Sequence, residues 1–126
     1  MRRRSFSQRK RAFVKVKDLT PTSRGINIIV KVLEVKDVRT VFSRRDNREH
    51  RVAEVLVGDE TGVVLMSLWD ENIERVQEGD VIEIGNGYVS LFRNEMRLNI
   101  GFYGSLKKSN KVIEEVDYSR NMSKRK

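Results

Sequence analysis

The fold is decided by residues 58–104, which read GDETGVVLMSLWDENIERVQEGDVIEIGNGYVSLFRNEMRLNIGFYG. Turn-forming Gly, Asp and Asn residues divide this stretch into short apolar runs at 63–69, 81–92 and 96–103. Runs of this length and composition predict β-strands joined by tight turns. We therefore expect three consecutive strands here, with the polar segment 70–79 forming a short helical turn between the first two.

The run 63–69 indicates how its strand is oriented. Val64, Met66 and Leu68 alternate with other residues, so their face is expected in the core. The opposite, more open face ends in Trp69, the single tryptophan of the chain.

The turns on either side of this run have recognisable signals. Residues 59–62 predict a hairpin turn in which Gly62 supplies a positive φ. After the run, Asp70 is expected to be the N-cap of the helical turn and Gly79 its terminator.

The run 81–92 changes the face that carries its apolar residues. Its inward positions are even-numbered at first and odd-numbered later: Ile82, Ile84, Val89 and Leu91. Such a switch requires an extra residue in the strand, and the Gly-Asn-Gly sequence at 85–87 is typical of a β-bulge. We expect this bulge to turn Tyr88 and Phe92 outward.

The outward face then carries three aromatic residues. Tyr88 and Phe92 are expected to share it with Trp69, and the last strand adds Arg97 and Asn99. These aromatic residues are either a stacking surface or part of the core. The separate aliphatic face of each strand favours the stacking surface.

Two further strands are predicted upstream, at 26–36 and 51–58. The first changes its buried face midway, as a strand of a small closed barrel does when it bends. The sequence does not decide the inward face of the second strand, because two alternating sets qualify: Val52 and Leu56, or Ala53, Val55 and Val57.

Residues 37–50 are predicted to form a polar loop between these strands. The loop and the residue after it hold a cluster of arginines: Arg39, Arg44, Arg45, Arg48 and Arg51. This loop is either a solvated hairpin tip or a cationic contact for a polyanion. His50 has no partner at metal-ligand spacing and is assigned no role.

The formal net charge of +8 is distributed unevenly over the 126 residues. Residues 1–17 contain eight Lys or Arg residues and no acidic residue, whereas 18–104 contain eleven basic and fifteen acidic residues. We predict a basic arm at 1–17, one domain at 18–104 and a basic, flexible tail at 105–126. The arm resembles an organelle transit peptide in composition but lacks an amphipathic apolar face.

Several classes of function are disfavoured by composition. Cysteine is absent, which excludes disulfides and thiolate metal sites. No apolar run approaches the roughly 20 residues of a membrane helix. With one histidine, no phosphate-cradling glycine loop and no pair of acids in an environment that would perturb their ionisation, we expect neither enzymatic activity nor a metal or cofactor.

Five strands with a helical turn between the third and fourth predict an all-β OB-fold, a five-stranded Greek-key barrel. Five motifs extend this interpretation: VGDETG at 57–62, LW at 68–69, EGDVI at 78–82, NGYVSLF at 86–92 and LNIG at 98–101. Together they resemble the archaeal single-OB-fold single-stranded DNA-binding proteins. That family is related to the human single-stranded-DNA sensor proteins and to the DNA-binding domains of replication protein A.

The resemblance implies a sequence-tolerant protein that protects single-stranded DNA in replication, recombination or repair. Three aromatic residues stack on bases in that family, and by position they fall on Trp69, Tyr88 and Phe92. Basic residues are expected to hold the phosphates from both sides of a groove: Arg44, Arg45, Arg48, Arg93 and Arg97. A cytoplasmic, nucleoid-associated protein is implied. Recruitment of replication or repair proteins is less clearly implied, because this tail lacks the long acidic end of many relatives.

Two other functions fit the same pattern. OB-folds also bind RNA, and nothing in the sequence distinguishes a 2′-hydroxyl group. Alternatively, the domain is a protein-interaction subunit of a replication or repair complex. Comparing matched DNA and RNA oligonucleotides separates these possibilities, since an interaction subunit would bind neither.

Overall fold

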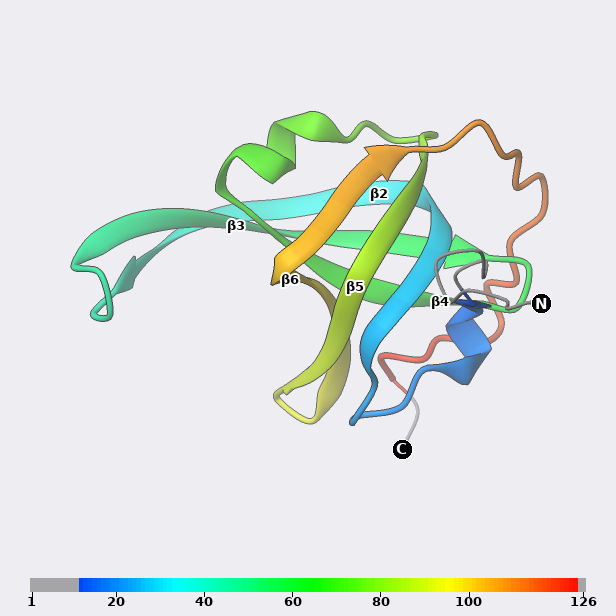
Figure 1. Ribbon diagram of the computed structural model, residues 1–126, viewed down its shortest axis with the longest axis horizontal. Helices are drawn as coiled ribbons and strands as arrows, with labels where there is room; N and C mark the ends of the chain where they lie inside the picture. The colour runs from blue at the N-terminus through cyan, green and yellow to red at the C-terminus, as the bar shows by residue number, and fades with distance from the viewer. Residues whose placement is uncertain (1–11, 125–126) are drawn as a thin grey trace, which may run out of the picture.

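A computed structural model describes residues 12–124 of the chain. Its body is a barrel of five long strands: β2 (Arg24–Ser43), β3 (Arg48–Asp59), β4 (Gly62–Trp69), β5 (Val81–Phe92) and β6 (Glu95–Lys108). They pair in the order β2-β3-β4-β6-β5, and β5 pairs again with β2 to close the barrel (Figure 1). Since β4 and β6 pair in parallel, the connection between them crosses over the barrel. The predicted five-stranded Greek-key OB-fold is confirmed.

The aliphatic residues fill the barrel as the alternation predicts. Val64, Met66 and Leu68 of β4 are almost completely buried. For β3 the sequence left two possible inward faces. The structure places the odd-numbered set in the core: Ala53, Val55 and Val57. Burial of these side chains drives folding, at about 25 cal/mol per Å² of apolar surface.

The bulge predicted at 85–87 is present. Ile28 of β2 pairs with Ile84 and Ile26 pairs with Gly87, so two residues of β5 oppose one of β2. Asn86 adopts the positive φ of 56° that this arrangement requires. Leu91, however, was expected inside and is 52% exposed. It lies near the β5–β6 turn, which projects beyond the barrel and its core (Figure 1).

The predicted helical turn is a 3-10 helix, η3 (Asp70–Arg75). The expectation that Asp70 is its N-cap is wrong, because Trp69 occupies that position and makes no side-chain cap. Asp70 instead has a φ of 52°, and its carboxylate accepts a hydrogen bond from the backbone N–H of Arg51 at 3.0 Å. Gly79 lies four residues beyond the helix and has a φ of 96°.

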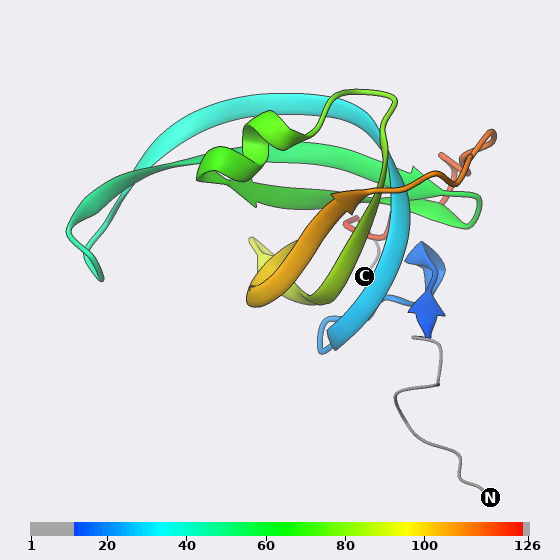
Figure 2. The same ribbon diagram turned by 45° about the horizontal axis from the view of Figure 1, so that its top comes forward.

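Residues 37–50 form an arm rather than an irregular loop. β2 and β3 remain paired from Val38↔Ala53 to Ser43↔Arg48, far beyond the barrel (Figures 1 and 2). Register shifts after Val32 and Val35 bend β2 where its apolar pattern changes face. We call residues 37–50 the β2–β3 arm.

The N-terminal residues that the structure describes pack on the barrel. β1 (Phe13–Val14) pairs in parallel with β2, and a short 3-10 helix, η2 (Val16–Asp18), follows it. Val16 is fully buried. Residues 12–17 therefore differ from the solvated arm expected at 1–17, and the rest of that arm lies outside the described residues.

The C-terminal residues also differ from the expected flexible tail. β6 continues to Lys108, and the following segment returns to β4. There the N–H of Val63 donates to the carbonyl of Arg120 at 2.7 Å, and the N–H of Met122 donates to the carbonyl of Val63 at 2.8 Å. We call residues 109–124 the C-terminal segment.

Buried polar groups hold this segment and η2 in place. The Asp59 carboxylate is completely buried and accepts hydrogen bonds from the backbone N–H groups of Val16, at 3.0 Å, and Thr61, at 2.8 Å. The hydroxyl of Ser123 accepts from the N–H of Leu65 and donates to the carbonyl of Met96. Since a buried polar group without a partner is costly, these contacts fix η2 and the C-terminal segment on the barrel.

The turn at 59–62 forms as predicted, but Gly62 is required for another reason. Its φ is not positive. A Cβ atom at this position would lie 2.8 Å from the carbonyl oxygen of Arg120. Glycine is therefore needed because the C-terminal segment approaches the backbone closely.

Candidate nucleic-acid interface

A groove of about 450 Å³ runs across the outer face of β3, β4, β6 and β5 and is bordered by residues of β2 in the β2–β3 arm. Trp69, Tyr88 and Phe92 all line it, and they are 44%, 40% and 41% exposed. The structure thus brings together the three aromatic residues that the alternation and the bulge placed on one face. We call this site the aromatic groove.

Different local structures position the three rings. Trp69 ends β4, pairs with Val52 of β3 and precedes the turn that Asp70 ties to the backbone of Arg51. Tyr88 lies opposite Asn99, and two of its ring carbons would be only 3.6 and 3.8 Å from a Cβ atom on Gly101. The ring of Tyr88 therefore packs over the bare backbone of that glycine.

Phe92 ends β5 beside the β5–β6 turn and lies among three guanidinium groups. The Cζ atoms of Arg93, Arg97 and Arg39 are 5.2, 5.4 and 5.9 Å from its ring centroid. Each distance is within the range of a cation–π interaction. Arg39 was not among the predicted site residues, because its place on the groove depends on β2 continuing into the arm.

Arg97 occupies a different environment from the one expected of a phosphate ligand. It is buried, and its guanidinium donates to Glu54 at 3.0 Å and to Glu95 at 3.2 Å. Two carboxylates therefore already compensate its charge. The structure places Arg97 in the lining of the groove, where it supports the ring of Phe92.

The remaining predicted cations lie at the two hairpin tips. Arg93 lies in the exposed β5–β6 turn with a φ of 54°. Three others are exposed at the end of the β2–β3 arm, outside the groove lining: Arg44, Arg45 and Arg48. None of these four side chains has an ion-pair partner within residues 12–124. Arg51, in contrast, is paired with Glu74 of η3 at 2.7 Å.

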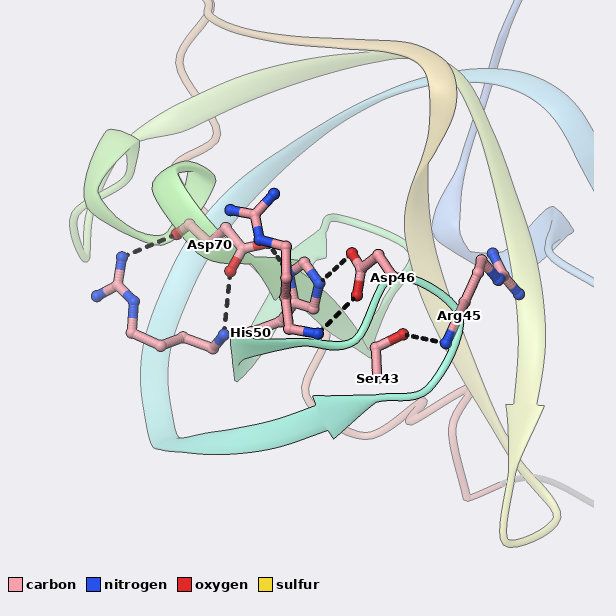
Figure 3. A network of polar contacts seen from close by, with 7 residues as sticks. Ser43, Arg45, Asp46, His50 and Asp70 are labelled. Atoms are coloured by element: carbon pink, nitrogen blue, oxygen red, sulfur yellow. Dashed lines mark hydrogen bonds and ion pairs between the residues drawn. The ribbon is translucent and has the colours of Figure 1, made fainter.

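His50 joins the arm to η3, a role for which the sequence held no signal. Its Nδ1 lies 2.8 Å from a carboxylate oxygen of Asp70, and its Nε2 lies 2.7 Å from one of Asp46 (Figure 3). Only the protonated imidazole has a proton to donate on each nitrogen. Alternation does not reveal this contact, since Asp70 lies on a different element.

These contacts change the ionisation of all three groups. Hydrogen bonds to Asp70 and then to Asp46 raise the pKa of His50 above its ordinary value of 6.5. The hydrogen bond to His50 in turn lowers the pKa of each carboxyl group. The cluster therefore favours a charged His50 between two carboxylates, and it fixes the turn that follows Trp69.

Residues 12–124 offer no group of three or more His, Asp or Glu side chains arranged to hold a metal ion. Within the same residues, no helix is long and apolar enough to cross a membrane.

Comparison with known proteins identifies close similarities in sequence. The family model described as single-stranded DNA binding protein Ssb-like, OB fold, matches residues 19–108. Over 87 residues the chain is 34% identical to the single-stranded DNA binding protein Ssb of Saccharolobus solfataricus. That alignment covers 69% of this chain and 57% of the relative, so the chain spans little more than half of that protein's length.

Similarity also extends to solved structures. The solution structure of a hypothetical protein from Arabidopsis thaliana is 27% identical, with a TM-score of 0.75 over 98% of this chain and 91% of that chain. The replication factor A related protein from Methanobacterium thermoautotrophicum shares the fold, at 22% identity and a TM-score of 0.65. That alignment covers 79% of this chain and 92% of the other.

Proposed function

This chain belongs to the Ssb-like OB-fold family of single-stranded DNA-binding proteins, and from that premise we propose that its aromatic groove binds single-stranded DNA with little preference for sequence. The observation that carries the proposal is the position of three half-exposed aromatic side chains in one groove. Every base has a face that can stack on an aromatic ring, so such a surface tolerates any sequence.

Trp69, Tyr88 and Phe92 are the stacking residues in this proposal. Their half-exposed rings leave surface for a base, while a separate set of aliphatic residues fills the core. Stacking contributes on the order of 1–3 kcal/mol per base. Three bases therefore supply a large share of a typical binding free energy.

Exposed arginines hold the phosphates on both sides of the groove. Arg39 and Arg93 are close to the ring of Phe92, so they can meet the backbone of a nucleotide stacked there. Arg44, Arg45 and Arg48 extend this contact along the β2–β3 arm. Arg97 acts indirectly, because its two carboxylate partners hold it in place beneath the bound strand.

A protein with these properties covers single strands exposed in replication, recombination or repair. In this role it is associated with the nucleoid, and it needs no cofactor. Its affinity arises from stacking and from phosphate contacts, neither of which depends on the order of the bases.

Fluorescence of Trp69 provides the experimental test, since it is the single tryptophan in the chain. Titration with an oligothymidylate should change the emission and saturate, because a base covers the indole ring. Matched oligouridylate serves as the comparison. Tighter binding of the RNA would identify an RNA-binding module, and no response to either polymer would support a protein-interaction subunit and contradict the proposal.

A further inference from the structure

Phe102 and Tyr103 are the most exposed aromatic residues that the structure describes, at 93% and 84%. They lie in β6, in a segment that departs from regular pairing with β5. Ile100 pairs with Gly87 and Ser105 pairs with Gly85, so residues 101–104 oppose the single residue between those two glycines. We call residues 101–104 the aromatic bulge, which corresponds to the sharp bend of β6 in Figure 1.

Two glycines allow the aromatic bulge to close. A Cβ atom on Gly104 would lie 2.8 Å from the backbone nitrogen of Gly101 and 3.0 Å from the carbonyl oxygen of Gly85. A Cβ atom on Gly101 would lie 3.2 Å from the carbonyl oxygen of Asn86. The backbone of the aromatic bulge is therefore tightly folded, although the side chains of Phe102 and Tyr103 contribute almost nothing to the core.

The two rings pack on each other edge to face, with centroids 5.0 Å apart and planes at 85°. In this arrangement each ring keeps much of its face in solvent. Free aromatic faces are what a stacking base requires.

The aromatic bulge lines a second groove of about 590 Å³, which adjoins the aromatic groove. Tyr88 lines both grooves and lies between them. Along the β5–β6 pair the order is Phe92, then Tyr88 opposite Asn99, then Phe102 three residues further along β6. Four residues of strand separate the first two rings by about 13 Å.

The polar lining of the second groove suits the same ligand. Among the residues that the structure describes, Arg24 is the only charged one that lines the second groove. The same lining includes the hydroxyl groups of Thr22 and Ser23 and the side-chain amide of Asn86. A cation with neutral hydrogen-bonding groups, and without a carboxylate, complements a phosphate backbone.

We propose that the bound single strand continues from the aromatic groove across Tyr88 into the second groove, where Phe102 and Tyr103 stack on further nucleotides and Arg24 contacts a phosphate. This inference rests on the proposed function, because it extends the same binding path. It predicts a footprint longer than the aromatic groove alone provides.

Oligothymidylates of two lengths test the inference, for example about 5 and about 15 nucleotides, which span the site sizes of OB-folds. The double substitution Phe102→Ala, Tyr103→Ala should leave affinity for the short strand unchanged. It should weaken binding of the long strand by about fivefold or more, the loss expected from one stacked base. Since both side chains are exposed, the melting temperature should not change.

Two further variants make the outcomes distinct. Trp69→Ala should weaken both strands, and Tyr118→Ala, which removes an exposed aromatic ring from the C-terminal segment, should weaken neither. If the double variant binds both strands like the wild type while Trp69→Ala does not, the continuation is overturned and the proposed function stands. If Trp69→Ala also has no effect, the proposed function fails as well.

Two other results would also overturn the inference. An equal loss for both lengths would place Phe102 and Tyr103 within the short site. A change in the sedimentation of the free protein, with oligonucleotide affinity unchanged, would assign the aromatic bulge to contact between copies of the chain.

Discussion

The two ends of β4 differ in how they are covered. At Gly62 the strand is covered by the C-terminal segment, whose backbone bonds to Val63 and whose Ser123 is fully buried. At Trp69 the strand ends in a half-exposed indole that lines the aromatic groove. One end satisfies its backbone and side chains within the chain, whereas the other presents apolar surface to solvent.

This difference separates stability from binding. Buried polar contacts at the covered end contribute to the free energy of unfolding, because their removal leaves unpaired groups in the interior. The aromatic rings at the open end contribute less to folding, and their exposed faces are available to a ligand. A substitution at one end should therefore change stability alone, and a substitution at the other should change binding alone.

The largest effect is expected beside the covered end, at Asp59 of β3, which pairs with Gly62. Asp59→Ala removes the acceptor for the backbone N–H groups of Val16 and Thr61, so the free energy of unfolding should fall by about 2–4 kcal/mol. Denaturant unfolding measures this change. Asp59→Asn is the matched control, since its amide keeps one acceptor oxygen and should cost less. An unchanged unfolding midpoint for Asp59→Ala would show that the two ends do not differ in this way.

Substitutions at the open end should weaken binding and leave the fold intact. Trp69→Ala, Tyr88→Ala and Phe92→Ala should each weaken binding of a single strand by about 1–3 kcal/mol. Fluorescence anisotropy of a labelled oligonucleotide gives the affinity, and circular dichroism reports folding. If these variants unfold, or if they bind normally, the rings are structural and the comparison breaks down.

Phosphate contacts at the tip of the β2–β3 arm should have a smaller effect on binding, and this effect should depend on salt. Replacing Arg44, Arg45 and Arg48 by Ala should reduce the slope of log affinity against log salt by about 0.7 for each phosphate that is no longer neutralised. Arg51→Ala is the control, because Glu74 already neutralises Arg51 on the side of η3. Equal slopes for the wild type and the triple variant would remove the arm from the binding path.

The smallest expected effect is a change of stability with pH, and it arises where the β2–β3 arm meets η3. Because the folded-state pKa of His50 is raised, its protonated form stabilises the fold fully below about pH 6.5, and this contribution disappears as pH rises through the raised value. His50 is the single histidine, so proton NMR follows its titration directly.

The NMR midpoint should lie above that of a free histidine and should fall in Asp70→Asn, which removes the main cause of the shift. Asp117→Asn is a suitable control, since Asp117 bonds to Ser119 in the C-terminal segment. A midpoint at or below the ordinary value would mean that His50 does not hold the arm to η3.

Much of the fold was accessible from the sequence because alternation records which face of a strand is buried. It oriented β4 correctly, and the Gly-Asn-Gly bulge in β5 explained how Tyr88 and Phe92 reach the face of Trp69. Alternation fails where a strand leaves the barrel, as at Leu91, because neither of its faces is then covered.

Other features depend on contacts that local sequence does not record. The C-terminal segment has no periodicity, because it bonds to β4 mainly through its backbone and buries few side chains. The ion pair of Arg97 with Glu54 joins residues from different elements, as does the contact of Asp70 with His50. Phe102 and Tyr103 lie in a run that predicted an ordinary strand. The glycines on both sides of them were the local signal for the aromatic bulge.

The most direct test of the central claim compares a single strand with its duplex at about 0.2 M salt. Trp69, Tyr88 and Phe92 can stack only on bases whose faces are free, and opening a duplex costs on average about 1.4 kcal/mol per base-pair step. Raising the salt screens phosphate attraction and leaves stacking, so selectivity should increase with salt. We predict a preference for the single strand of at least about a hundredfold, and equal affinity for the duplex would contradict the account.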